Sequence, residues 1–489
     1  MRYVSTRGQS PAVPASTAIL NGLAPDGGLY VPESLPALDL AALQGLSYRA
    51  RAEKILSLFL TDFPAAALHD CVESAYTAEK FGGEDPAPLH ALSGDRHLLE
   101  LWHGPTCAFK DMALQILPHL LAKSLKIQGE TRRAVILVAT SGDTGKAALE
   151  GFCNAPGTAI LVFYPGDGVS EIQKRQMITQ RGENVGVCGI QGNFDDAQTG
   201  VKALFSDPAV QKKMEKAHAF LSSANSINFG RLVPQIVYYV HAYLTLVEQG
   251  RIALGDPIRV CVPTGNFGNI LAAFMAARMG LPIERFVCAS NENDVLTEFI
   301  QTGRYNRVRP FHTTISPSMD ILISSNLERL LWYLTDQNTT RVAAWMKQLK
   351  ETGEYRITGA PFSLLSGLFE AASLNEEETA AAIRKTEETD HTVIDPHTAV
   401  AVGALEKVAP ADCPTVIAST ASPFKFTRAV LSALGEQGSE DPFEELSLLE
   451  KKAGKAPRSL SELKSLPVRF PQVVGKTEME SVLESFVQK

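Results

Sequence analysis

The sequence lacks the patterns that mark membrane-spanning, metal-binding and disulfide-bonded proteins. Its seven cysteines are scattered and form no Cys-x-x-Cys pair, which is typical of reduced thiols in a cytoplasmic protein. No apolar run approaches the length that crosses a bilayer, and the first residues lack the apolar core of a secretory signal. We therefore expect a cytoplasmic protein with no membrane partner and no bound metal.

Positive charge is also in short supply. Lysine and arginine number 46 against 54 aspartates and glutamates, a net charge of -8, whereas nucleic acids and anionic membranes are bound by clustered positive charge. The chain has no Gly-x-Gly-x-x-Gly dinucleotide fingerprint, and Gly475-Lys-Thr477 lacks the upstream glycine that a phosphate-binding P-loop requires. We expect no nucleic-acid partner, while a small anionic ligand remains compatible with a few basic residues gathered at one site.

The overall amino-acid composition is that of an ordinary folded protein. The 489 residues are 45% hydrophobic and 20% charged, which suits two or three domains. We expect an N-terminal α+β domain over residues 1–90, and a central region over 91–435 that contains a small subdomain at about 112–250. A tail over 436–489 is expected to pack on the large subdomain.

Short apolar runs alternate with amphipathic stretches after residue 98. We predict strands at 134–139, 159–163, 184–188 and 258–262, and helices at 144–152, 168–180, 195–205 and 232–248. Further helices are predicted at 51–60, 65–79, 319–334, 341–350, 364–372 and 376–388. This alternation predicts an α/β fold with parallel sheets covered by helices on both faces. Because such sheets bind ligands where a strand passes into a helix, each of these junctions is a candidate site.

The most unusual junction contains Lys110. The stretch from Leu99 to Ala113 is typical of an apolar strand, a Gly-Pro turn and a helix that begins near Lys110 and Asp111. A lysine among apolar neighbours loses part of its affinity for a proton and becomes a usable nucleophile or base, as imine chemistry with an aldehyde requires. The alternative is a lysine that caps the helix or extends to solvent, and this stretch alone does not decide between the two.

Two other junctions are suited to anions. Thr140-Ser-Gly-Asp-Thr-Gly145 follows a predicted strand and opens a helix, where free backbone amides bind a carboxylate or a phosphate, although a simple helix cap explains the same residues. Pro263-Thr-Gly-Asn-Phe-Gly-Asn269 also joins a strand to a helix, and its glycines allow the backbone to approach a phosphate closely.

The remaining junctions supply polar side chains. Ser419-Thr420 ends a strand, and its hydroxyls suit either a heterocycle nitrogen or a helix cap. The segment Ser223–Arg231 carries serines and asparagines before an arginine, which suits either a second anion or a surface ion pair. An imine-forming lysine, a phosphate cradle and a hydroxyl for a ring nitrogen are together the parts that pyridoxal phosphate needs.

These motifs resemble those of the threonine synthase family, in its longer microbial and fungal form. The resemblance rests on His103-Gly-Pro-Thr-Cys-Ala-Phe-Lys-Asp111, Ser141-Gly-Asp-Thr-Gly145 and Gly265-Asn-Phe-Gly-Asn269. It begins at Tyr3-Val-Ser-Thr-Arg-Gly8 and runs to Thr420, and so covers nearly all of the chain except the tail. The fold it implies is that of the tryptophan synthase β-subunit, with two parallel-sheet subdomains.

The resemblance implies a role for each motif. Lys110 would be the catalytic residue and hold pyridoxal 5'-phosphate covalently through an imine, and Thr420 would lie near the pyridine nitrogen. The remaining cofactor-binding residues implied at the phosphate are Gly265, Asn266, Phe267, Gly268 and Asn269. The implied substrate-binding residues are Ser141, Asp143, Thr144, Asn225, Ser226 and Arg231. Two departures from the family pattern bear on the polarity of the pocket: Ser422 replaces a histidine and Lys146 replaces a small residue.

The implied activity is the conversion of O-phospho-L-homoserine and water to L-threonine and phosphate. The alternatives are a phospho-lyase of the same fold that releases a keto acid, and a binding protein without activity. A nicotinamide-dependent oxidoreductase also suits the alternation of strands and helices but lacks the fingerprint. We expect a monomer or a homodimer.

Overall fold

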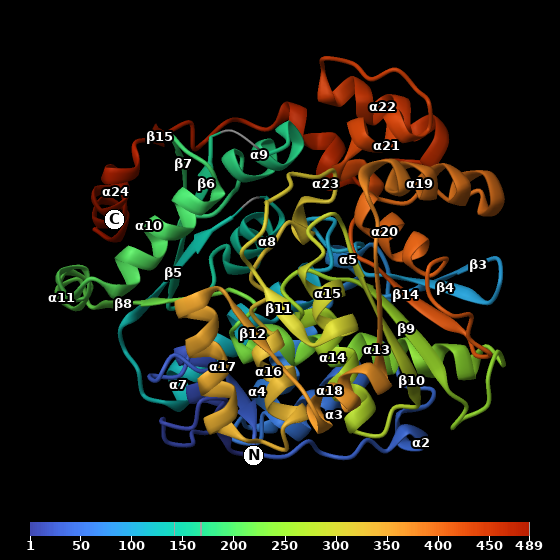
Figure 1. Ribbon diagram of the computed structural model, residues 1–489. Coiled ribbons are helices and arrows are strands. Elements are labelled where there is room, and N and C mark those ends of the chain that lie inside the picture. Colours follow the sequence, from blue (N-terminus) through green and yellow to red (C-terminus); the bar gives the residue numbers. More distant parts are fainter. Residues whose placement is uncertain (141, 167–168, 489) are drawn as a thin grey trace.

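Two parallel sheets, lying side by side and surrounded by helices, form the framework of the protein. The computed structural model describes residues 1–140, 142–166 and 169–488, and Figure 1 shows the small sheet on the left and the large sheet on the right. The α/β fold predicted from the sequence is confirmed. Within the described residues, the protein has no helix with the length and apolarity that a membrane span requires.

The large sheet has the strand order β13-β10-β9-β14-β4-β3. All neighbours are parallel except the edge hairpin of β3 and β4, which turns at Gly94 and Asp95. Its strands are β3 (Leu89–Leu92), β4 (Arg96–Glu100), β9 (Ile258–Pro263), β10 (Ile283–Ser290), β13 (Phe369–Ser373) and β14 (Thr415–Ser419).

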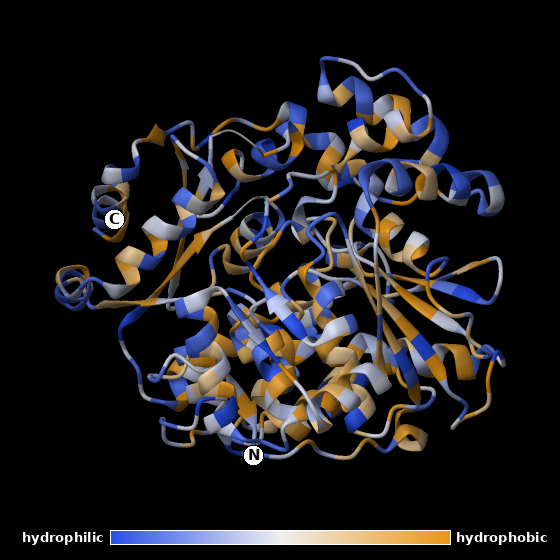
Figure 2. Ribbon diagram, in the orientation of Figure 1, coloured by the Kyte–Doolittle hydropathy of each residue, from blue (hydrophilic) through white to orange (hydrophobic). Residues whose placement is uncertain are grey.

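The small sheet is parallel throughout, in the order β15-β7-β6-β5-β8. Its strands are β5 (Arg133–Ala139), β6 (Thr158–Pro165), β7 (Val185–Ile190), β8 (Ala219–Ser222) and β15 (Val473–Val474). Both β6 and β7 are buried along their whole length, as apolar strands covered on both faces are. Figure 2 shows the same pattern, with apolar strands inside and polar stretches on the outer helices.

Helices fill the connections between strands. Those that precede residue 250 in the central region are α6 (Asp111–Leu114), α7 (Leu117–Ile127), α8 (Asp143–Phe152), α9 (Glu171–Ile178), α10 (Phe194–Ser206), α11 (Pro208–Lys216), α12 (Phe229–Leu232) and α13 (Pro234–Glu248). The later ones are α14 (Gly268–Arg278), α15 (Val295–Thr302), α16 (Leu327–Leu334), α17 (Thr339–Thr352), α18 (Ala360–Leu368), α19 (Glu376–Asp390), α20 (Pro396–Ala404) and α21 (Thr427–Ala433). The short 3-10 helices η1 (Pro317–Met319) and η2 (Pro423–Lys425) and the strand pair β11 (Arg304–Asn306) and β12 (Glu354–Arg356) complete this region.

The N-terminal region shares its hydrophobic core with the rest of the protein. It contains β1 (Tyr3–Ser5), α1 (Ala15–Asn21), β2 (Tyr30–Pro32), α2 (Leu40–Leu43), α3 (Tyr48–Phe59), α4 (Ala65–Ala75) and α5 (Ala78–Phe81). Helix α1 packs on α7, and α3 packs on α13. Buried Arg51 of α3 bonds to Glu248 and, at 2.9 Å, to Nδ1 of His241 on α13. Because α13 packs on α3 and α14, it lies with the large sheet, and the small subdomain ends before residue 250.

The tail contacts the large subdomain, on which it is expected to pack, and extends beyond it to the small subdomain. It contains α22 (Pro442–Ala453), α23 (Arg458–Ser461), η3 (Glu462–Ser465), β15, η4 (Lys476–Glu478) and α24 (Met479–Val487). Helix α22 packs on α21, whereas β15 extends the small sheet and α24 packs on α10 and α11. Figure 1 shows this path across the top of the molecule. The unpaired backbone N–H and C=O groups of an edge strand pair readily with a short apolar segment. Composition alone does not predict such pairing.

Three predicted helices are wrong in extent. The prediction for 65–79 divides into α4 and α5, and that for 364–372 contains strand β13, which pairs with β10. Residues 320–326 are not helical, because Ser324 and Asn326 bond to the carbonyl oxygens of Gly265 and Asn266 instead. Tertiary hydrogen bonds have overridden local propensity at this segment.

Arg329 connects three distant segments beneath this loop. Its side chain is fully buried and donates to the carbonyl oxygens of Tyr30 at 3.0 Å and Ile227 at 2.6 Å, and to the side chain of Asn326. Burial lowers the pKa of the guanidinium to about 10, so it remains charged at neutral pH. The N-terminal region, the 223–228 segment and the start of α16 are thereby held together.

Arg329→Met should lower the free energy of unfolding by about 3 kcal/mol, because three buried acceptors lose their donor. Urea denaturation followed by far-UV circular dichroism measures this. Arg356→Met is the matched control, since Arg356 is exposed, and its effect should stay within about 0.5 kcal/mol. An equal effect of the two substitutions would contradict this role for Arg329.

Candidate active site

Lys110 lies in a tightly held loop between β4 and α6. The carboxylate of Asp111 accepts hydrogen bonds from the backbone amide and the hydroxyl of Thr106, both at 2.8 Å. The amide of Phe109 donates to the carbonyl oxygen of Thr420 at 2.8 Å. Cys107 in the same loop has φ 59°, a left-handed conformation that non-glycine residues seldom adopt. The lysine is therefore placed by a rigid loop rather than by a mobile one.

The amine of Lys110 is buried and contacts few polar groups. Its Nζ donates to Oγ of Ser318 at 3.3 Å and lies 3.6 Å from Oδ2 of Asp143. Burial lowers the pKa of Lys110, and repulsion by Lys425 and Arg231 adds to this against the attraction of Asp143. The structure therefore shows a buried amine at Lys110, not one that extends to solvent.

Asp143 faces Lys110 from the first turn of α8. Its carboxylate accepts hydrogen bonds from Gln173 at 2.9 Å and from Ser318 at 3.2 Å, and lies 2.5 Å from Nζ of Lys425. Burial by itself raises the pKa of Asp143, but Lys425 and Lys110 hold it well below its usual range. Of the neighbours predicted to bind substrate, Thr144 is half-buried and Ser141 lies outside the described residues.

The loop Gly265–Phe267 adjoins the lysine through Ser318. A Cβ on Gly265 would lie 2.8 Å from the carbonyl oxygen of Ser318, so glycine permits the close approach. Phe267 has φ 63° and is buried, a strained backbone of the kind that functional sites retain. Toward the described part of the chain, the amides of Gly265, Asn266 and Phe267 donate no hydrogen bond. These free amides precede helix α14 and suit an anion.

The side chain of Asn269 points to the same requirement for a ligand. Its Oδ1 accepts hydrogen bonds from Tyr238 at 2.7 Å and Tyr239 at 2.5 Å. Its buried Nδ2 has no partner among the described residues, although buried donors are nearly always satisfied. Gly268, the first residue of α14, is also buried. The phosphate of pyridoxal phosphate would supply the missing acceptor, so the residues present fit that group.

Arg231 is a second group without its partner. It is 4% exposed, its Nη1 donates to the carbonyl oxygen of Ala224 at 2.6 Å, and its Nε has no hydrogen bond in the described protein. Burial lowers the pKa of Arg231 to about 10, which leaves it charged at neutral pH. An uncompensated buried charge is costly, and an anionic ligand would remove that cost.

The segment before Arg231 bonds to the cradle through a loop that the sequence patterns do not reveal. The backbone carbonyl oxygen of Asn225 accepts a hydrogen bond from the backbone amide of Asn228 at 3.0 Å. Ser226 contacts Ser325 at 3.3 Å between hydroxyl oxygens, and Ser325 donates to Oδ1 of Asn266 at 3.3 Å. The structure thus connects the predicted substrate segment to the predicted phosphate loop.

Thr420 follows β14 directly and is 5% exposed. Because its carbonyl oxygen accepts the amide of Phe109, its backbone runs beside the residue that precedes Lys110. Ser422, one of the two departures from the family pattern, is buried and caps η2. Lys146, the other departure, is also buried but pairs with Glu150 at 2.9 Å and with Gln180, so it is neither a surface residue nor bonded to the groups around Lys110.

Two residues of the site are not identifiable from the sequence patterns. Ser318 lies in η1, in a segment without a recognisable motif, and contacts Lys110, Asp143 and, through its amide, Nε2 of His397 at 3.1 Å. Lys425 is fully buried. The one feature of the sequence that points to its burial is its position between Phe424 and Phe426, shortly after a strand.

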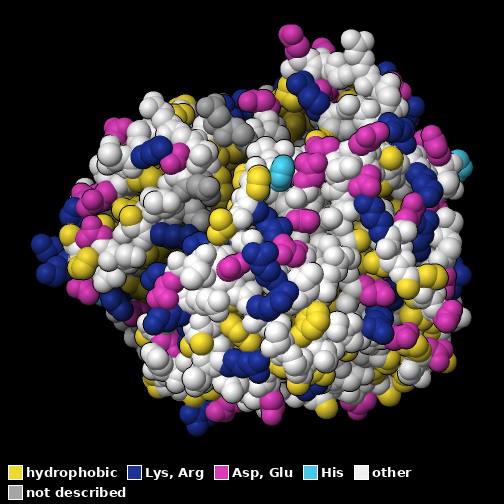
Figure 3. Space-filling model, viewed as in Figure 1, with side chains coloured by type: hydrophobic (Ala, Val, Ile, Leu, Met, Phe, Trp, Pro, Cys, Tyr) yellow, Lys and Arg dark blue, Asp and Glu magenta, His cyan; other side chains and the backbone are white. Residues whose placement is uncertain are grey.

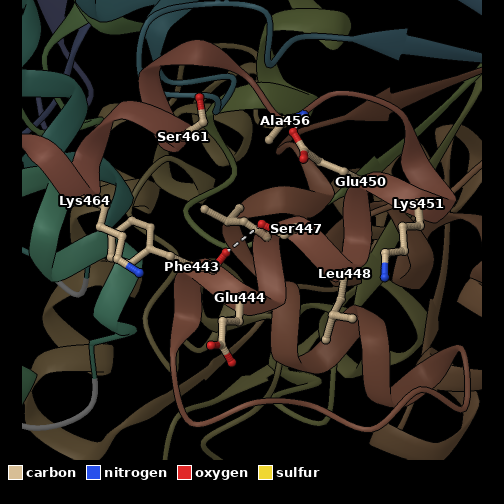
Figure 4. A pocket seen from close by; sticks show the side chains of 10 residues that line it. Phe443, Glu444, Ser447, Leu448, Glu450, Lys451, Ala456, Ser461 and Lys464 are labelled. Atoms are coloured by element: carbon tan, nitrogen blue, oxygen red, sulfur yellow. Dashed lines mark hydrogen bonds between the residues drawn. The ribbon is translucent and has the colours of Figure 1, made fainter.

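Two hollows elsewhere on the surface contain none of these groups, and the larger one, of about 990 Å³, has His69, His119 and Lys123 in its lining. A cavity of about 490 Å³ lies in the tail beside α22, with Phe443, Ser447 and Lys464 in its lining (Figure 4). On the face shown in Figure 3, acidic and basic side chains are interspersed. The cluster around Lys110 therefore remains the candidate active site.

Comparison with known families covers nearly the whole chain. Residues 2–76 match the profile described as "Threonine synthase N terminus", 82–415 match "Pyridoxal-phosphate dependent enzyme" and 398–482 match "Threonine synthase, C-terminal". The match to the second profile contains Lys110, Gly265 and Arg231.

Individual relatives agree with these profiles. "Threonine synthase-like 1" of Homo sapiens is 44% identical over 86% of this chain, which spans only 58% of the relative's length. "Threonine synthase" of Pseudomonas aeruginosa is 41% identical over 88% of this chain and 90% of its own length. The crystal structure of pyridoxal-phosphate-bound threonine synthase from Brucella melitensis superposes with a TM-score of 0.90, at 38% identity and full coverage of both chains. The chain therefore belongs to the threonine synthase family of pyridoxal-phosphate dependent enzymes.

Proposed function

We propose that the protein converts O-phospho-L-homoserine and water to L-threonine and phosphate, as the last step of threonine biosynthesis. This proposal rests on the buried amine of Lys110 and on two groups near it that could bind anions. These groups are the backbone amides of Gly265–Phe267 and the side chain of Arg231, and both have unused hydrogen-bond donors. A substrate with a phosphate and a carboxylate, bound beside a phosphorylated cofactor, requires several such groups.

The cofactor would be held by groups that follow three strands of the large sheet, β4, β9 and β14. Lys110 would bind its aldehyde carbon covalently, and the loop amides with Asn269 would bind its phosphate at the start of α14. Thr420 would lie near the ring nitrogen. When bound, pyridoxal phosphate supplies an electron-withdrawing ring that takes up the electron pairs released at the substrate carbons.

Lys110 then acts as the proton carrier. With the substrate bound, the free Nζ of Lys110 would be a buried base that removes protons from Cα and Cβ of the substrate. Phosphate leaves from Cγ, water adds at Cβ, and protons return to Cγ and Cα. Burial of the amine favours this work, because the lowered pKa of Lys110 keeps more of it neutral near pH 7.

Arg231, with Asn225 and Ser226, is proposed to bind an anionic group of the substrate. The charge of Arg231 is buried without a carboxylate partner in the described residues, and Asp143 and Thr144 with Ser141 would complete the substrate side. Removing water from this cluster strengthens each of these interactions.

A second candidate activity would give a different product from the same substrate. The human relative carries the name "Threonine synthase-like 1" rather than threonine synthase, which keeps open a phospho-lyase that releases a keto acid. The two differ only in whether water adds at Cβ before the product leaves.

All seven cysteines are free thiols, several of them deeply buried. This supports the proposed cytoplasmic location, where thiols remain reduced. A monomer or a homodimer remains the prediction for the assembly.

Purified protein incubated with O-phospho-L-homoserine should release phosphate and threonine in equal amounts. Lys110→Ala should lose the visible absorption of the bound cofactor and lower kcat by at least about 1000-fold, since both the attachment point and the proton carrier are gone. Lys126→Ala, which changes an exposed lysine on α7, is the matched control. Release of 2-oxobutanoate instead of threonine would favour the phospho-lyase.

Gly265→Ala should weaken cofactor binding by about tenfold or more, because the added methyl meets the carbonyl oxygen of Ser318 at 2.8 Å and shifts the loop. Fluorescence titration of the apoprotein with pyridoxal phosphate measures the affinity. In the control Gly367→Ala the methyl meets nothing within 4 Å, and the affinity should not change. Unchanged affinity in Gly265→Ala would remove this loop from the proposed cradle.

Thr420→Asp should shift the absorption spectrum of the reacting enzyme, because a carboxylate would keep the ring nitrogen protonated where a hydroxyl leaves it largely unprotonated. Thr420→Ser is the control that keeps the hydroxyl. Stopped-flow spectra recorded with substrate compare the variants, and identical spectra in Thr420→Asp and the parent protein would contradict a position beside the nitrogen.

A further inference from the structure

A second lysine, Lys425, is buried opposite Lys110. Its side chain is completely inaccessible, and its Nζ donates to the carbonyl oxygen of Thr106 at 3.0 Å and lies 2.5 Å from Oδ1 of Asp143. It comes from η2, which follows β14, whereas Asp143 belongs to α8 of the small subdomain. The pair therefore joins the two subdomains at the site.

One carboxylate thus stands between two amines. Oδ1 of Asp143 lies 2.5 Å from Lys425, while Oδ2 lies 3.6 Å from Lys110. A single negative charge offsets only one of two positive charges. In a buried site, the amine whose charge is not offset loses its proton. Lys425 makes the shorter contact with Asp143 and also donates to the carbonyl oxygen of Thr106, so the carboxylate lies closer to Lys425 than to Lys110.

The other described groups that face Lys110 offer it no negative charge in place of Asp143. From α12, Arg231 repels a charge on Lys110, while from η1 Ser318 offers only a hydroxyl. Gln173 of α9 is a neutral donor to Asp143. Asp111, in the turn of Lys110 itself, is occupied by Thr106, and His397 of α20 contacts Ser318 rather than the amine.

We propose that Lys425 is a positioning residue that takes up the charge of Asp143, so that the amine of Lys110 stays neutral and free to attack an aldehyde and to move protons. Without Lys425, the buried carboxylate would pair with Lys110 alone and hold its proton. This inference rests on the proposed attachment of the cofactor to Lys110.

The test follows how fast the apoprotein captures pyridoxal phosphate across the pH range, by the rise of the visible band. In Lys425→Met the midpoint of the pH profile should move up by about one unit, which is about tenfold slower capture near pH 7. Lys425→Arg, which keeps the charge, should remain near the parent midpoint. In the double variant Lys425→Met/Asp143→Asn the midpoint should return toward the parent value, because the carboxylate that traps the proton is gone.

An unchanged midpoint in Lys425→Met would overturn the proposal, and so would a double variant as impaired as the single one, since that result indicates a purely structural role. If Lys425→Met does not fold, Asp143→Asn alone decides: the proposal requires its midpoint to fall below that of the parent, and an unchanged midpoint refutes it. Absence of any visible band in the parent protein would instead refute the attachment of the cofactor to Lys110.

Discussion

The desolvation of one amine is the constraint on which the rest of the structure depends. Lys110 must lose its proton readily at neutral pH and yet lie next to a carboxylate that would retain it. Burial lowers its pKa, and the positive charges of Lys425 and Arg231 act in the same direction. The carboxylate of Asp143 contacts both Lys110 and Lys425, and the contact with Lys425 is the shorter one.

The fold brings these charges together because parallel strands end at a common edge. The loops after β4, β9 and β14 of the large sheet carry Lys110, Gly265 and Thr420. The helices after β5 and β8 of the small sheet, α8 and α12, carry Asp143 and Arg231. Besides the pair of Lys425 and Asp143, contacts with the N-terminal region and the tail help to hold the two sheets together. Arg329 binds the N-terminal region to the loop before α16, and the tail joins both subdomains through α22 and β15.

Sequence patterns predict those parts of the site that depend on neighbouring residues. A strand, a turn and a helix start identify Lys110, and glycines before a helix identify the cradle at Gly265. Ser318, Ser325 and Lys425 are harder to predict, because their roles arise from contacts between residues far apart in the chain. The same reason explains the helix predicted across 320–326, where hydrogen bonds to the Gly265 loop prevail over helical propensity.

Of the two buried lysines that face Asp143, we assign the cofactor to Lys110 and the balancing charge to Lys425. The most direct test is to reduce the cofactor-loaded protein with borohydride, digest it and locate the modified lysine by mass spectrometry. The account predicts a pyridoxyl group on Lys110 and none on Lys425. A pyridoxyl group on Lys425, or on neither, would contradict it.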